Sequence, residues 1–67
     1  MKYMLAGFRK ERGMTQRELA DALGESRRNV EDWDRGKRLP QVDKAVRIAR
    51  FFGVSVEDMF EEEEGIG

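Results

Sequence analysis

The chain has no cysteine and no histidine, and only one proline among its 67 residues. Without cysteine it forms no disulfide bond, and without either residue it builds no zinc finger and carries no Cys or His catalytic group. No apolar run approaches the roughly 18 residues of a membrane span, and no signal peptide is visible. We therefore expect a cytoplasmic domain with no metal, cofactor or small-molecule ligand, stabilised by a packed apolar core. We do not expect an enzyme.

The small net charge hides an uneven distribution. The chain has 13 Lys and Arg against 14 Asp and Glu, a formal net charge of −1. Four of the acids form one run, Glu61–Glu64, and no basic residue follows it. Residues 1–60 therefore carry a modest basic excess, and this length allows one domain. We predict that residues 61–67 form an acidic, flexible tail.

Glycines at positions 13, 24, 36 and 53 each follow a stretch in which apolar residues recur three or four apart. That pattern is typical of helices that end at a glycine, and no segment shows the alternation of a strand. We predict five short helices, at about 2–12, 15–23, 26–35, 41–52 and 55–60. Thr15 with Glu18 predicts a capping box, and Ser26 and Ser55 predict further caps. The predicted core comprises Met4, Leu5, Phe8, Leu19, Ala20, Leu23, Val30, Trp33, Val42, Ala45, Val46, Ala49, Phe52, Met59 and Phe60, with Ile48 and Phe51 partly buried.

Only Gly24 and Glu25 separate the second helix from the Ser26 cap, so the two helices must pack at a steep angle. Residues 15–36 read TQ-x2-LA-x2-LG-x-S-x3-V-x2-W-x2-G, and matching flanks occur at 8–14 and 40–55. This pattern, over about residues 3–60, resembles the phage repressor and Cro type of helix-turn-helix domain, often called Xre-like. The resemblance implies an all-α, five-helix, lambda-repressor-like bundle. It also implies a transcriptional regulator, a repressor, that binds double-stranded operator DNA as a homodimer with the third helix in the major groove.

The third helix presents one face for reading bases. At 100° per residue, Val30 and Trp33 point inward, which favours core packing over base stacking by the indole. The early residues of a recognition helix approach base edges, where arginine donates to guanine and a carboxylate accepts from cytosine. We therefore predict base contacts from Arg27, Arg28, Glu31 and Asp32. The two acids either read bases or orient arginines one turn away, through the pairs Arg27–Glu31, Arg28–Asp32 and Glu31–Arg35.

Phosphate contacts are predicted on both sides of that helix. Free N–H groups around Thr15 and Gln16, at the start of the second helix, should point at the DNA backbone. The resemblance implies the same role for the Gln16 amide, and a second phosphate clamp formed by Arg35, Lys37 and Arg38. It also implies a structural ion pair between Arg9 and Asp34. For the dimer we predict the surface Val54–Phe60, because its apolar side chains cannot all fit inside so small a core.

A protein-binding module remains the alternative function. Small domains of this type also occur as antitoxin-type regulators whose main contact is another protein. The outward acids Glu31 and Asp32, together with the acidic tail, would suit a basic partner. Retention of specific DNA distinguishes the two functions.

Overall fold

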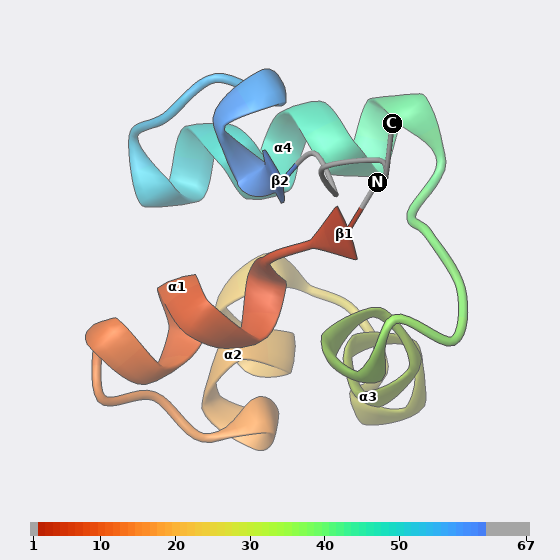
Figure 1. The fold of residues 1–67 in the computed structure, drawn as a ribbon. Helices are drawn as coiled ribbons and strands as arrows, with labels where there is room; N and C mark the ends of the chain where they lie inside the picture. The colour runs from red at the N-terminus through yellow and green to blue at the C-terminus, as the bar shows by residue number, and fades with distance from the viewer. Residues whose placement is uncertain (1, 62–67) are drawn as a thin grey trace.

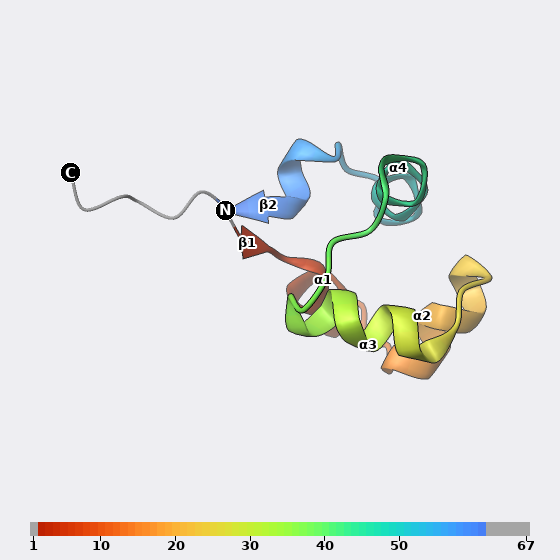
Figure 2. The ribbon, with the colours of Figure 1, turned by 90° about the vertical axis from the view of Figure 1, so that its right-hand side faces the viewer.

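The computed structural model describes residues 2–61. Its elements are β1 (Lys2–Tyr3), α1 (Leu5–Glu11), α2 (Gln16–Leu23), α3 (Arg27–Arg35), α4 (Val42–Phe52), the 3₁₀ turn η1 (Glu57–Met59) and β2 (Phe60–Glu61). Figures 1 and 2 show α1, α2 and α3 on one side of the molecule and α4 with η1 on the other. Of the predicted tail, Glu61 belongs to β2, and 62–67 lie outside the described residues. Within residues 2–61 no helix has both the length and the apolar character of a membrane span.

The predicted capping box and short turn between α2 and α3 are confirmed. The Thr15 hydroxyl accepts from the Glu18 N–H at 3.0 Å, and the Glu18 carboxylate accepts from the Thr15 N–H at 2.9 Å. The helix α2 ends at Gly24, whose φ of +69° is a left-handed conformation that glycine adopts without strain. Ser26 then caps α3 by accepting from the N–H of Asn29 at 3.1 Å. Local hydrogen bonds thus fix both ends of the turn.

The core lies where the two sides of the molecule meet. The largest fully buried side chains, with less than 2% of their surface exposed, come from every helix and from η1: Leu5, Leu19, Val30, Ile48 and Met59. Trp33 is also buried, at 4% exposed, which confirms its predicted place in the core. Because every helix and η1 contribute at least one buried side chain, α3 is held against the core along its inner face.

The predicted inward face of α4 is wrong at one end. Val42 is 82% exposed, and Val46 is only partly buried. Ile48, predicted to be partly buried, is 1% exposed. Val42 has the right helical phase, but it is the first residue of α4 and no described element covers that end. Helical phase alone therefore misplaced it.

The prediction of five helices is also wrong, because residues 2–61 form four α-helices and a strand pair. Strands β1 and β2 pair antiparallel, Tyr3 opposite Phe60, and the N–H of Met4 donates to the Met59 carbonyl at 2.7 Å. The first helix therefore begins at Leu5 instead of about residue 2. The predicted Ser55 cap is present, with Asp58 as its partner. The helical turn that follows nevertheless ends at Met59, because Phe60 is extended to pair with Tyr3.

Candidate nucleic-acid interface

The outer face of α3 carries the side chains predicted to read bases. Val30 is fully buried beneath the helix, whereas Arg27 and Arg28 are exposed. Glu31 and Asp32 are partly buried on the same helix. In Figure 2, α3 lies on the side of the molecule that faces the viewer. The structure therefore brings all four predicted residues onto one accessible helix surface.

Glu31 is covered by an arginine. The Arg27 Nε atom lies 3.1 Å from Glu31 Oε1, in the predicted i,i+4 pair. The Arg27 side chain is 63% exposed and that of Glu31 only 31%, so the guanidinium lies outside the carboxylate. An exposed pair of this kind contributes at most about 1 kcal/mol to folding. The pair instead fixes the direction of the Arg27 side chain and partly neutralises the charge of Glu31.

Asp32 does not pair with Arg28 as predicted. Its carboxylate accepts from Arg38 Nε at 3.1 Å, because the loop after α3 returns to this residue. The backbone N–H groups of Lys37 and Arg38 both donate to the Asp32 carbonyl, at 2.8 and 3.4 Å. Arg28 is left with no ion-pair partner within residues 2–61. The predicted Glu31–Arg35 pair is likewise not among the ion pairs of that region, since Glu31 pairs with Arg27.

A partly buried ion pair fixes α3 from its other side. Arg9 donates to both oxygens of Asp34, from Nε at 2.9 Å and from Nη2 at 3.1 Å. The two side chains are 12% and 8% exposed. Burial acts to raise the pKa of Asp34, but the hydrogen bonds from Arg9 and Gln16 outweigh it and hold that pKa below its usual value. Arg9 also donates to the Met14 carbonyl at 2.7 Å, so one guanidinium ties α1, the start of α2 and α3 together.

Some of the residues predicted to bind phosphate already use their hydrogen-bond donors within the protein, and others do not. The Thr15 N–H already donates to Glu18, and one amide hydrogen of Gln16 donates to Asp34 at 3.1 Å. Gln16 thus supports the recognition helix, and its second amide hydrogen is available for a phosphate. Arg35, the last residue of α3, and Lys37, which follows the end of the helix, are both exposed. Arg38 is turned back onto α3, which separates it from the other members of the predicted clamp.

A second polar cluster, which the sequence did not predict, joins the turn to α4. The Glu25 carboxylate accepts from Lys44 at 3.0 Å and from Asn29 at 3.3 Å, and Arg47 lies 3.5 Å away. Burial acts to raise the pKa of Glu25, but these donors outweigh it and the pKa is lowered. Arg47 also donates to the Leu23 carbonyl at 2.8 Å. Because Lys44 and Arg47 lie 19 and 22 positions from Glu25, no local pattern indicates their part in the cluster.

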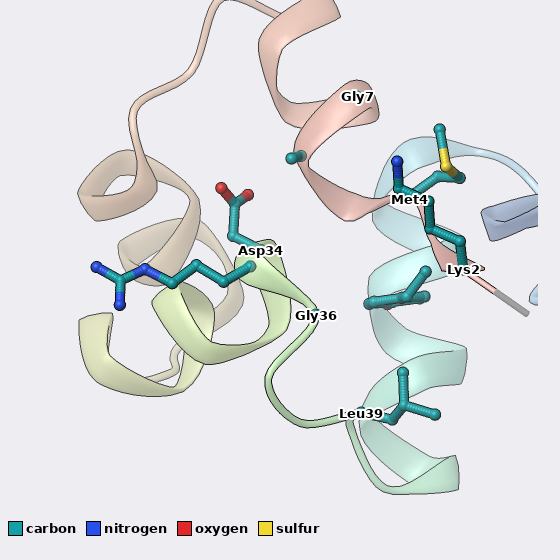
Figure 3. A pocket seen from close by; sticks show the side chains of 9 residues that line it. Lys2, Met4, Gly7, Asp34, Gly36 and Leu39 are labelled. Atoms are coloured by element: carbon teal, nitrogen blue, oxygen red, sulfur yellow. The ribbon is translucent and has the colours of Figure 1, made fainter.

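A cavity of about 620 Å³ lies beside the end of α3 (Figure 3). Lys2, Met4 and Gly7 border it from one side and Gly36 and Leu39 from the other. Its one carboxylate, Asp34, is already bonded to Arg9 and Gln16. Tyr3 and Arg35 also line it, and the buried Tyr3 hydroxyl has no hydrogen-bond partner among the described residues.

Comparison with known proteins identifies the family of this chain. The family model described as helix-turn-helix matches residues 5–59, nearly the whole chain. The chain belongs to the helix-turn-helix family, of the Xre/Cro-like type. The resemblance that its motif indicated is thereby confirmed.

The relatives of this helix-turn-helix protein are named as regulators. It is 42% identical over 60 residues to an uncharacterised HTH-type transcriptional regulator of Methanocaldococcus jannaschii, covering 90% of this chain and 91% of the relative. It is 38% identical over 60 residues to another such regulator, from Archaeoglobus fulgidus, covering 90% and 86%. A crystal structure of a transcriptional regulator from Listeria innocua superposes with a TM-score of 0.73 at 22% identity, over all of this chain and 68% of that one. That superposition shows a shared fold.

Proposed function

We propose that this protein is a sequence-specific transcriptional regulator of the cytoplasm, a repressor that places α3 in the major groove of an operator. Membership of the helix-turn-helix family and the names of its relatives support DNA-binding regulation. The observation that carries the proposal is the position of Arg27 and Arg28. Both are exposed at the start of α3, opposite the buried Val30 and Trp33. Docking by the helix start is how this motif reaches base edges.

The acids on α3 are compatible with this function because arginines cover them. Arg27 is 63% exposed over Glu31 at 31%, and Arg38 is 57% exposed over Asp32 at 16%. The more accessible member of each of these two pairs is therefore the arginine. Coulomb repulsion between the carboxylates and phosphates is opposed at close range by each paired cation.

The proposal gives the exposed residues separate roles. Arg27 and Arg28 each donate to guanine O6 and N7. Glu31 orients Arg27, and Asp32 contributes an acceptor on the same face. The residues proposed to hold phosphates are Thr15, through its hydroxyl proton, and Gln16, through its second amide hydrogen, at the start of α2, and Arg35 and Lys37 at and just after the end of α3. Such contacts fix the position of α3 on the duplex and make the affinity depend strongly on salt.

We propose further that the protein binds as a homodimer, with half-sites about one helical turn apart. The proposed dimer surface is Val54–Phe60. Within it Met59 is 1% exposed, whereas Val54, Val56 and Phe60 are partly buried and pack against the core. The oligomeric state is measured by sedimentation with and without a palindromic duplex. A chain that stays monomeric in both conditions would overturn the dimer while leaving the role of α3 open.

Selection from a pool of random duplexes at about 0.15 M salt tests the function. We expect the wild type to enrich one sequence, and Arg28→Ala to weaken binding to it at least about tenfold, the discrimination of a bidentate arginine contact. Arg50→Ala is the matched control, because Arg50 is an exposed arginine in the last turn of α4. Equal losses from both variants would mean that charge alone matters and would contradict base reading by Arg28.

The second candidate function is binding to another protein. The observation that favours it is the exposure of two apolar side chains beyond α3, Leu39 at 60% and Val42 at 82%. If protein binding is the main function, no duplex sequence is enriched over the starting pool. The double variant Leu39→Ser/Val42→Ser then abolishes the contact with the partner protein. Enrichment of one duplex by both the wild type and that double variant would exclude it as the main role.

A further inference from the structure

Arg38 occupies a place fixed by the end of α3. The helix ends at Gly36, which has a φ of +75°. The N–H of Gly36 donates to the Trp33 carbonyl at 3.1 Å, and that of Lys37 donates to the Asp32 carbonyl at 2.8 Å. These two bonds form the usual glycine-terminated helix end. The chain is thereby turned back along α3, and the backbone of Arg38 lies beside Asp32.

Two acceptors on α3 hold the Arg38 guanidinium. Its Nε donates to Asp32 Oδ2 at 3.1 Å, and its Nη2 donates to Asn29 Oδ1 at 3.0 Å. Asn29 is itself oriented, because its amide nitrogen donates to Glu25 at 3.3 Å. A guanidinium has five N–H donors, so those on Nη1 and the second one on Nη2 have no acceptor in the part of the chain that the structure describes. The Arg38 side chain is 57% exposed, and these donors are accessible.

This arrangement fits a base better than a phosphate. A phosphate clamp needs only a positive charge, which Lys37 next to it also supplies. A phosphate contact would not require the guanidinium to be held in place by Asp32 and Asn29. A guanidinium held in a fixed plane instead matches the paired acceptors O6 and N7 of guanine.

We propose that Arg38 determines operator sequence: held by Asp32 and Asn29, it reads a guanine in the major groove. This inference rests on the proposed function, since it requires α3 to lie in the groove. It assigns Asp32 to positioning Arg38. Arg38 and Asp32 then act as a unit, and loss of either removes the same base preference.

The base preferences of single variants test whether Arg38 and Asp32 act together. We compare profiles selected from random duplexes for the wild type and for Arg38→Ala, Arg38→Lys and Asp32→Asn. All three variants are expected to lose, at the same base pair of each half-site, a preference for guanine of at least about tenfold. The double variant Arg38→Ala/Asp32→Asn should show no greater loss at that base pair than Arg38→Ala alone. Thermal unfolding of each variant checks the fold, which this exposed pair hardly supports.

Lys37→Ala is the matched control, because Lys37 is exposed and precedes Arg38 directly. It should keep every base preference, weaken all duplexes alike and reduce the salt slope by about 0.9. An Arg38→Lys variant that retains the wild-type profile would overturn the inference and leave Arg38 a phosphate contact. A wild-type chain that enriches no duplex would overturn the proposed function itself.

Discussion

Three acids on α3 have different roles because their surroundings differ. Asp34 is 8% exposed and receives two bonds from Arg9, so it belongs to the interior. Asp32 is covered by an arginine of the following loop, and Glu31 by an arginine of the same helix. The helical wheel gave their faces correctly but could not give the partner of Asp32, since that partner lies outside the helix.

Loss of the Asp34 carboxylate should be costly. Arg9 would then be a largely covered cation without its partner, and breaking a fully buried pair in this way typically costs about 3–5 kcal/mol. We expect Asp34→Ala to lower the free energy of unfolding by about 3 kcal/mol, measured by urea denaturation. Asp21→Ala, which removes an exposed acid of α2, should change it by less than about 0.5 kcal/mol. A loss below about 1 kcal/mol for Asp34→Ala would contradict the structural role of the pair.

The same residue predicts a loss of stability in acid. The pKa of Asp34 is lower in the folded chain than its ordinary value, about 3.9 in an unfolded chain. The stability that this carboxylate contributes is therefore fully present above about pH 4 and is lost as the pH falls through the lowered pKa. Urea denaturation between about pH 6 and pH 2.5 should show a steeper decline for the wild type than for Asp34→Asn. Parallel curves would assign the acid sensitivity to other carboxylates.

Among the elements, α2 and α3 are defined by local signals. Their hydroxyl caps and glycine ends lie within three residues of the helix ends that they fix. The chain ends follow a different rule, because β1 and β2 pair through residues almost 60 positions apart. Local periodicity therefore predicted the helix-turn-helix correctly and overextended the first and last helices. The same limit applies to the site: Arg38 reaches Asp32 only because the loop after Gly36 turns back.

Two glycine substitutions test this account with opposite signs. At Gly36 a side chain must adopt a left-handed backbone, with φ of +75°, so Gly36→Ala should destabilise the fold by about 1–2 kcal/mol. Gly7 lies inside α1, where an added Cβ would meet only Met4 Cε, at 3.9 Å. Gly7→Ala should therefore stabilise the fold by about 0.5–1 kcal/mol. Thermal denaturation measures both, and equal effects from the two variants would contradict the helix ends described here.

At the scale of the whole molecule, the strand pair joins the two sides of the fold. The rings of Tyr3 and Phe60 lie 5.0 Å apart, and Tyr3 is 6% exposed. Burial raises the pKa of Tyr3 to about 12. In Figure 2 the strand pair lies above and to the left of α3. The molecule thus separates the part that closes the fold from the surface proposed to bind DNA, which remains accessible.

We propose that the outer face of α3 binds DNA. Backbone amide chemical shifts measure where the duplex contacts the protein. The isotope-labelled chain is titrated with the selected duplex, and the shift of each amide is followed. We expect the largest changes in amide chemical shift at Gln16, Arg27, Arg28 and Asp32, and little change at Arg50. Changes concentrated in Val54–Phe60 or along α4, with the amides of α3 unmoved, would contradict it.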